Sequence, residues 1–130
     1  MSNLYTYPYD SAYVPPMPVV DITITSPGQQ QISATITALV DSGADATLIP
    51  INVLEQVGAR YVDKARIWGI LGHSQAVDVY LVTLQIGPNQ IYSVRAIAVE
   101  VGATAILGRN ALNHIVVTLN GLANTTELLA

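Results

Sequence analysis

The sequence contains no cysteine in its 130 residues. Disulfides, thiol catalysis and metal sites with cysteine ligands are therefore excluded, and the absence suits a reducing compartment. The two histidines, His73 and His114, lie far apart, and their surroundings lack the spacing of a metal site or of a Ser/His catalytic pair. We expect neither a metal ion nor a cofactor.

Charge is also scarce. Charged residues make up 11% of the chain and apolar residues 51%, whereas roughly 25% of a typical soluble domain is charged. Burial between subunits is the simplest way to keep such a surface out of water, because obligate dimer interfaces resemble a domain core cut in half. We therefore expect a homodimer. Nucleic acid is a poor candidate partner, because the net charge is -4 and no long stripe is formed by the five basic residues, Arg60, Lys64, Arg66, Arg95 and Arg109.

The chain lacks a long apolar run. A membrane-spanning helix needs about 18 apolar residues, and even the segment AIAVEVGATAILG is interrupted by Glu100 and by glycines. The first ten residues, MSNLYTYPYD, have neither the cationic region nor the apolar core of a secretory signal. We expect a soluble, cytoplasmic protein without a membrane partner.

The length predicts a single domain. Residues 1–18 contain four of the seven tyrosines and four of the seven prolines, with little apolar periodicity. We interpret them as an extended N-terminal arm. It is a disordered tail, a strap that lays tyrosines on the domain or on a partner subunit, or a pro-segment ahead of the barrel. Residues 19–122 then form the folded domain and residues 123–130 a C-terminal tail.

From residue 19 onward the sequence is typical of short strands. Apolar and polar residues alternate with period two over residues 19–25 and again over residues 32–38. Further strands are predicted at residues 75–86, 91–99 and 114–119, with turns at Ser26-Pro27-Gly28 and Gly87-Pro88-Asn89. Only residues 50–57 and 109–114 indicate helix. The pattern predicts an all-β fold, a mostly antiparallel barrel or sandwich.

The segment ALVDSGADATLI, residues 38–49, places two carboxylates in one of the most apolar parts of the chain. Because Asp41 directly follows Leu39 and Val40, we expect its carboxylate at the end of a buried strand, where it needs hydrogen bonds. Ser42 offers a hydroxyl and Gly43 an open backbone amide. The alternative is an ordinary turn, since Asp, Ser and Gly all favour turns.

Four segments together resemble the retropepsins, the retroviral-type aspartic proteases. ALVDSGADATLIP resembles the family's active-site loop, and ILGRNAL at residues 106–112 resembles its second motif, an apolar strand followed by a glycine turn and a short helix. IWGILGHS at residues 67–74 stands where the family carries its flap hairpin, and VVTLNGL at residues 116–122 resembles the strand that closes the family's dimer. The resemblance implies a retropepsin-like closed β barrel with one short C-terminal helix, a single lobe that acts as a homodimer.

The resemblance also implies an aspartic endopeptidase whose catalytic residue is Asp41. Each subunit would supply one Asp41, and the two would share a proton because neighbouring carboxylates cannot both ionise easily. One carboxylate then activates the water that attacks the peptide carbonyl, while the protonated carboxyl polarises the carbonyl oxygen. Ser42 and Gly43 would support the active-site loop.

Two further sets of residues follow from the resemblance. Asp45 is expected to pair with Arg109 and so to hold the loop against the C-terminal helix; the alternative is that both are merely solvated, since exposed pairs contribute little. The residues implied to bind substrate are Ala44, Asp45, Gly69, Ile70, Thr104 and Ile106. Of these, Ala44, Ile70, Thr104 and Ile106 would line apolar subsites, which predicts a preference for hydrophobic residues around the scissile bond.

Trp68 and Leu71 stand at flap positions that are commonly glycine in retropepsins, and Trp68 is alternatively a buried core aromatic. The altered flap favours a second function class, a catalytically silent retropepsin-fold dimer that binds extended peptides by strand addition. The intact Asp-Ser-Gly triplet favours the enzyme, because a binding module has no need of a paired carboxylate. A third interpretation, a structural β-barrel subunit with a coincidental turn, requires that the Gly-Arg-Asn motif is also coincidental.

Overall fold

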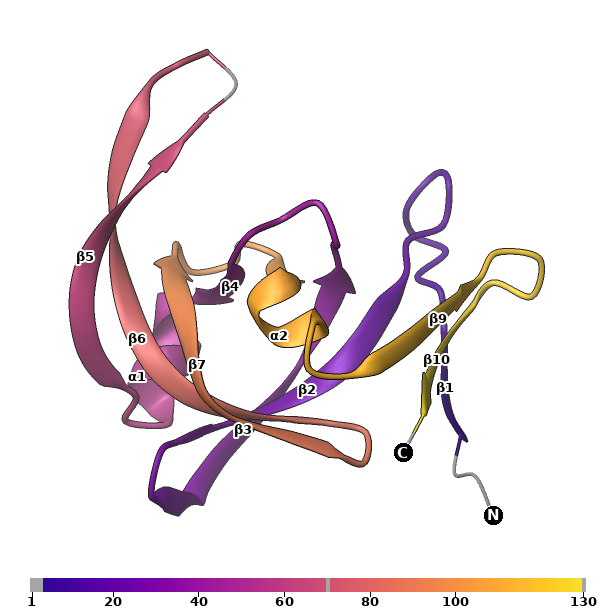
Figure 1. Ribbon diagram of the computed structural model, residues 1–130, viewed down its shortest axis with the longest axis horizontal. Coiled ribbons are helices and arrows are strands. Elements are labelled where there is room, and N and C mark those ends of the chain that lie inside the picture. The colour runs from indigo at the N-terminus through magenta and orange to yellow at the C-terminus, as the bar shows by residue number, and fades with distance from the viewer. Residues whose placement is uncertain (1–3, 70, 130) are drawn as a thin grey trace.

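The computed structural model describes residues 4–69 and 71–129, and this part of the chain contains ten strands and two short helices (Figure 1). Neither helix has the length and apolarity needed to cross a membrane. In chain order the elements are β1 (Leu4–Pro8), β2 (Val19–Ser26), β3 (Gln29–Val40), β4 (Thr47–Pro50), α1 (Ile51–Gln56), β5 (Arg60–Trp68), β6 (Ser74–Ile86), β7 (Asn89–Val99), β8 (Ala105–Leu107), α2 (Arg109–Leu112), β9 (Val116–Asn120) and β10 (Thr125–Leu129).

Six strands form a closed barrel. They are hydrogen-bonded in the order β2-β3-β8-β4-β7-β6, and β2 pairs with β6 to complete the ring. Only the β3–β8 and β4–β7 pairs are parallel, so the barrel is mostly antiparallel. The predicted all-β barrel is confirmed, and the sandwich alternative is wrong because the ring leaves no two separate sheets.

Alternation along the strands fills the barrel. In β2, Val20, Ile22 and Ile24 are buried, while Asp21 is exposed and Thr23 is half-buried. Fully burying one such side chain stabilises the fold by roughly 1.5–3 kcal/mol. Thr23 of β2 faces outward, where its hydroxyl group is hydrogen-bonded to that of Thr35 on β3 at 2.9 Å. The period-two pattern in the sequence therefore arises because every second side chain of the strand points into this core.

The predicted strands at residues 19–25, 32–38, 75–86 and 91–99 coincide with β2, β3, β6 and β7. The strand expected at residues 114–119 begins two residues later, because the last turn of α2 continues with the His114 amide donating to the Ala111 carbonyl. β4, β5, β8 and β10 were not predicted from alternation. β4 and β8 are too short to show it, and β5 is exposed along nearly its whole length.

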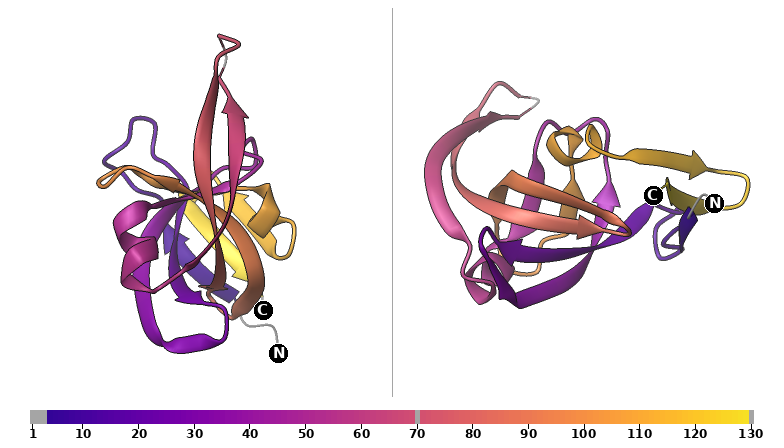
Figure 2. Two further views of the ribbon diagram at one scale, coloured as in Figure 1. Left: turned by 90° about the vertical axis from the view of Figure 1, so that its left-hand side faces the viewer. Right: turned by 60° about the horizontal axis from the view of Figure 1, so that its bottom comes forward.

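The two ends of the chain pair with each other. β1 lies antiparallel to β10, from Leu4 opposite Leu129 to Pro8 opposite Thr125, and β10 pairs with β9 in a three-stranded sheet beside the barrel (Figure 2). Tyr7 and Leu128 anchor this sheet to the barrel core. Burial, and secondarily the charge of Asp21, raises the pKa of Tyr7. The disordered-tail alternative is therefore wrong for residues 4–8, and residues 125–129 form a strand instead of a free tail.

Gly108, between β8 and α2, lies against the backbone of the loop that joins β3 to β4. A Cβ at this position would stand 2.5 Å from the Ala46 carbonyl carbon and closer still to its oxygen. Its φ of -94° is open to any residue, so the need for glycine comes from the close approach and not from the backbone angle.

We expect Gly108→Ala to lower the free energy of unfolding by about 2–4 kcal/mol, because the obstructing atoms are backbone and cannot rotate away. Urea denaturation at matched protein concentration measures the loss. Gly121→Ala is the matched control, because a Cβ there meets nothing within 4 Å. Equal stability of the two variants would contradict the close contact.

Candidate active site

Asp41 is placed by the strand that precedes it and by the turn that follows. Its amide donates to the Leu107 carbonyl at 3.1 Å, which extends the β3–β8 pairing by one residue. The Gly43 amide then donates to Asp41 Oδ1 at 2.9 Å, and the Ala44 amide donates to the Asp41 carbonyl at 3.2 Å. A carboxylate held by a backbone amide has a fixed orientation. The loop therefore presents one carboxylate in a defined direction.

Asp41 is exposed in the single chain, as are Ser42 and Gly43. The expectation of a buried carboxylate is therefore wrong for the isolated chain. The reason is that β3 ends at Val40, and the loop of residues 41–46 projects beyond the barrel. In Figure 1 this loop stands above the barrel, between β3 and β4. The carboxylate is open to water and to ligands, and only a second molecule against this face could bury it.

Arg109 holds the loop at three points. Its Nη2 donates to Asp45 Oδ1, its Nη1 donates to the Ser42 carbonyl at 2.7 Å, and its backbone amide donates to the Ala44 carbonyl at 2.9 Å. The structure thus brings Asp45 and Arg109 together as an ion pair. Because the Asp45 side chain is 89% exposed, the pair itself contributes at most about 1 kcal/mol. The bonds to the Ser42 and Ala44 carbonyls are what define the loop's shape.

Behind the loop, a buried hydroxyl connects three elements. Thr47 Oγ1 accepts from the Gly108 amide at 3.2 Å and donates to Asn110 Oδ1 at 2.8 Å, while Asn110 Nδ2 donates to the Arg95 carbonyl at 2.8 Å. Thr47 is fully buried, so the loss of a partner would cost about 1–3 kcal/mol. The sequence analysis missed Thr47 and Asn110; the available signal was a single hydroxyl residue in an otherwise apolar strand.

A long hairpin faces the loop across a cavity. β5 and β6 pair as far as Trp68 opposite Ser74, and the hairpin that they form arches above the barrel in Figure 1. Gly69 and residues 71–73 are the described part of its tip. Trp68 is 72% exposed and Leu71 is 85% exposed. The core-aromatic alternative for Trp68 is therefore wrong, and this hairpin occupies the position of the expected flap.

The cavity between hairpin and loop has a volume of about 380 Å³. One wall is the loop itself, including Ala44 and Asp45, and the opposite wall is the end of β5 with Ile67 and Trp68. Leu48 and Ile97 form the apolar floor. A peptide side chain could lie here between the loop and the hairpin.

The remaining residues expected to bind substrate are placed differently. Gly69 lies at the flap tip, where its amide donates to the His73 carbonyl at 2.9 Å, and Ile70 lies outside the described residues. Thr104 lines a second cavity, of about 320 Å³, which is bounded by β3 and the N-terminal arm. Ile106 pairs with Leu39 and Leu48 within the barrel wall. The structure therefore does not bring Thr104 or Ile106 into the loop–hairpin cavity.

Within residues 4–69 and 71–129, no group of three or more histidine or acidic side chains is arranged to hold a metal ion. Asp41 and Asp45 are adjacent in the loop but have separate partners, the Gly43 amide and the Arg109 guanidinium. In the described part of the chain, Asp45 is therefore paired with a cationic side chain and Asp41 is not.

Similarity to known proteins agrees with this geometry. A family model described as gag-polyprotein putative aspartyl protease matches residues 31–114. A retropepsin-like aspartic protease from Rickettsia conorii superposes with a TM-score of 0.65 at 10% identity, over 99% of this chain and 92% of that one. EIAV protease in complex with the inhibitor HBY-793 gives a TM-score of 0.54 at 19% identity, over 75% of this chain and 86% of that one. No curated protein sequence matches the chain.

The two structural similarities have low identity and therefore show a shared fold alone. The family model is more specific than these structural similarities, because residues 31–114 include both the Asp-Ser-Gly loop and the Gly-Arg-Asn segment that is hydrogen-bonded to it. The matched region is more than half of the chain. The chain therefore belongs to the retropepsin family of aspartic proteases.

Proposed function

We propose that the protein is an aspartic endopeptidase that hydrolyses peptide bonds as a homodimer, with one Asp41 from each subunit. The observation that carries the proposal is the exposed Asp41 carboxylate, which the Gly43 amide orients beside an open cavity bounded by a flap-like hairpin. Its substrate is a protein or peptide, because the site is an open groove between a strand end and a hairpin.

The chemistry needs two carboxylates, and the chain has a single Asp-Ser-Gly triplet. In a two-fold dimer the two Asp41 side chains meet and share one proton, since both cannot easily be charged at close range. The ionised carboxylate takes a proton from a water molecule, whose oxygen attacks the carbonyl carbon, while the protonated carboxyl donates to the carbonyl oxygen. Collapse of the tetrahedral intermediate breaks the C–N bond. The amine nitrogen receives the proton that the first carboxylate took from water, and a hydroxyl proton of the intermediate returns to the second carboxylate as the C=O bond re-forms.

Arg109 and the flap hairpin have two further roles in the proposed mechanism. Arg109 positions the loop through the Ser42 and Ala44 carbonyls. The flap hairpin would close over the bound peptide and exclude water, the role that such lids have in many enzymes. The apolar floor of Leu48 and Ile97 supports a preference for hydrophobic side chains in this cavity.

Exposed apolar side chains on the three-stranded sheet support dimer formation. Leu4, Leu129 and Val116 stand in one cross-strand row of this sheet, and all three are exposed. β9 is an edge strand in the described sheet. On the opposite face of β9 from Val116, a hollow of about 210 Å³ is lined by residues that include Leu119 and Ser42 of the active-site loop. A second copy that pairs along the β9 edge would contact both faces of this strand and lie beside that loop.

A catalytically silent dimer that binds extended peptides is the second candidate. The exposed apolar side chains of Trp68 and Leu71 on the hairpin favour it, because they offer binding area without chemistry. The oriented Asp41 carboxylate favours the enzyme, since a binding module gains nothing from it. A cytoplasmic location stays a prediction.

We expect the protein to cleave an unstructured substrate such as casein, with a bell-shaped pH profile that reports the shared proton. Asp41→Asn should lower kcat/KM by on the order of 10³-fold, because the amide can neither accept the water's proton nor share one. The assay compares both proteins, purified identically, from acidic to neutral pH.

Asp45→Asn is a control for the loop, because it removes the ion pair but leaves the Arg109 bond to the Ser42 carbonyl. It should reduce activity far less than Asp41→Asn. If neither the wild-type protein nor any variant cleaves casein although a dimer is present in solution, the silent peptide-binding dimer becomes the better description.

We expect Val116→Asp to convert the dimer to a monomer and to abolish cleavage, because it places a charge in the apolar row. Sedimentation velocity measures the oligomeric state. Ile32→Asp is the matched control: Ile32 is 53% exposed against 57% for Val116, but it lies in the barrel wall. A Val116→Asp protein that remains dimeric and active would place the interface elsewhere.

A further inference from the structure

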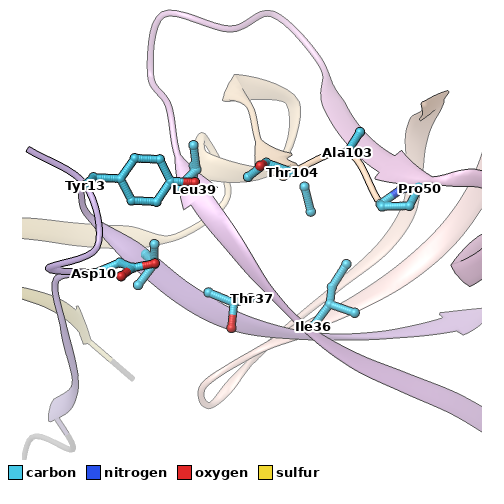
Figure 3. A pocket seen from close by; sticks show the side chains of 10 residues that line it. Asp10, Tyr13, Ile36, Thr37, Leu39, Pro50, Ala103 and Thr104 are labelled. Carbon is cyan, nitrogen blue, oxygen red and sulfur yellow. The ribbon is translucent and has the colours of Figure 1, made fainter. Parts of the chain in front are cut away.

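The second cavity lies between the N-terminal arm and the barrel, and its chemistry differs from that of the loop–hairpin cavity. Its volume is about 320 Å³. Most of its walls are apolar, but the arm adds a carboxylate and a phenol (Figure 3). The residues that carry the argument are Asp10, Tyr13, Thr37, Leu39, Ala103 and Thr104.

Asp10 is held in place by its own backbone and by the turn that follows. Its amide donates to the Met17 carbonyl at 2.8 Å, the Met17 amide donates back to the Asp10 carbonyl at 3.1 Å, and the Ala12 amide donates to Oδ1 at 2.9 Å. These bonds close residues 10–17 into a loop. In Figure 3 the Asp10 carboxylate and the Tyr13 ring both point from this loop toward β3. These hydrogen bonds therefore fix the position of the Asp10 carboxylate in the cavity wall.

Within residues 4–69 and 71–129, Asp10 has no ion-pair partner. All five basic residues lie in the described part, and the ion pairs there join Lys64, Arg95 and Arg109 to other carboxylates. Asp10 is half-buried beside apolar side chains. Its carboxylate is reached by solvent and adjoins apolar side chains, so a cation from outside the chain can pair with it there.

The cavity is continuous with the strand that delivers Asp41. Thr37 and Leu39 line it, and Asp41 is the next residue in that alternating series, roughly 7 Å beyond Leu39 along the extended backbone. In the view of Figure 1 the loop of residues 10–17, the active-site loop and the flap hairpin all point upward from the barrel. A peptide that crosses Asp41 can therefore place a side chain in this cavity.

On the basis of the proposed function, we propose that this cavity is a substrate subsite beside the scissile bond and that Asp10 makes it selective for lysine or arginine. The aliphatic part of such a side chain would lie along Leu39 and Ala103, and its charged end would reach the Asp10 carboxylate. The two-fold symmetry of the dimer supplies one such cavity on each side of the bond. Hydrophobic selectivity then belongs to the loop–hairpin cavity, and basic selectivity to this one.

The test digests a mixture of random octapeptides that contains lysine and norleucine in equal amounts, and sequences the products by mass spectrometry. These two side chains share a linear aliphatic stem and differ in charge. We expect the wild-type protein to select lysine over norleucine at a position adjoining the cleaved bond. Asp10→Asn should lower this lysine-to-norleucine ratio about tenfold, the loss of one charge-assisted hydrogen bond.

Two variants separate selectivity from folding. Asn at position 10 keeps an oxygen that can accept the Ala12 amide, so the loop of residues 10–17 is retained. Glu55→Gln removes a carboxylate from the exposed face of α1 and should leave the ratio unchanged. Asp10→Lys should transfer the preference to glutamate, a gain that a merely structural role of Asp10 would not produce. Equal ratios in wild type, Asp10→Asn and Asp10→Lys would overturn the subsite.

A binding measurement makes the subsite testable without turnover. The same mixture is retained on immobilised Asp41→Asn protein and on Asp41→Asn/Asp10→Asn protein, and the bound peptides are sequenced. Lysine enrichment that depends on Asp10, with no cleavage by the wild-type protein, would support the subsite and overturn the proposed hydrolysis. Cleavage without any Asp10-dependent enrichment would support the hydrolysis and overturn the subsite.

Discussion

The contact between the start of α2 and the active-site loop is the constraint on which the rest of the site depends. Gly108 permits the backbone of Ala46 to approach where a Cβ would collide, and Arg109 can then reach the Ser42 and Ala44 carbonyls. Thr47 and Asn110 hold the same junction from the buried side. The orientation of Asp41 and the shape of the cavity beneath the flap both follow from this contact, although the two segments lie more than 60 residues apart in sequence.

In the proposed dimer, a second copy would complete both the site of Asp41 and the exposed apolar row. A single chain presents one Asp41 together with Leu4, Leu129 and Val116, and all four side chains are exposed. We propose that association buries the apolar side chains and brings the second Asp41 into place. Activity would then depend on protein concentration, because the proposed site needs two chains.

The N-terminal arm shows why composition is a weak guide to order. Its tyrosines and prolines have no period that predicts a core, yet β1 completes a sheet with β10 and Tyr7 packs against the barrel. Residues 10–17 then form a loop whose Asp10 and Tyr13 line a cavity next to β3. One segment thus connects the three-stranded sheet with the cavity next to β3.

Local patterns in the sequence determined much of this protein. Alternation predicted β2, β3, β6 and β7, since a strand's two faces are set by neighbouring residues, and the Asp-Ser-Gly and Gly-Arg-Asn segments identified the loop and its clamp. Only the tertiary structure decided the exposure of Asp41, the pairing of β1 with β10, the separation of Thr104 from Ala44 and the place of Asp10. These features depend on which distant segments pack together. Such contacts are fixed by closure of the barrel and leave no period in the sequence.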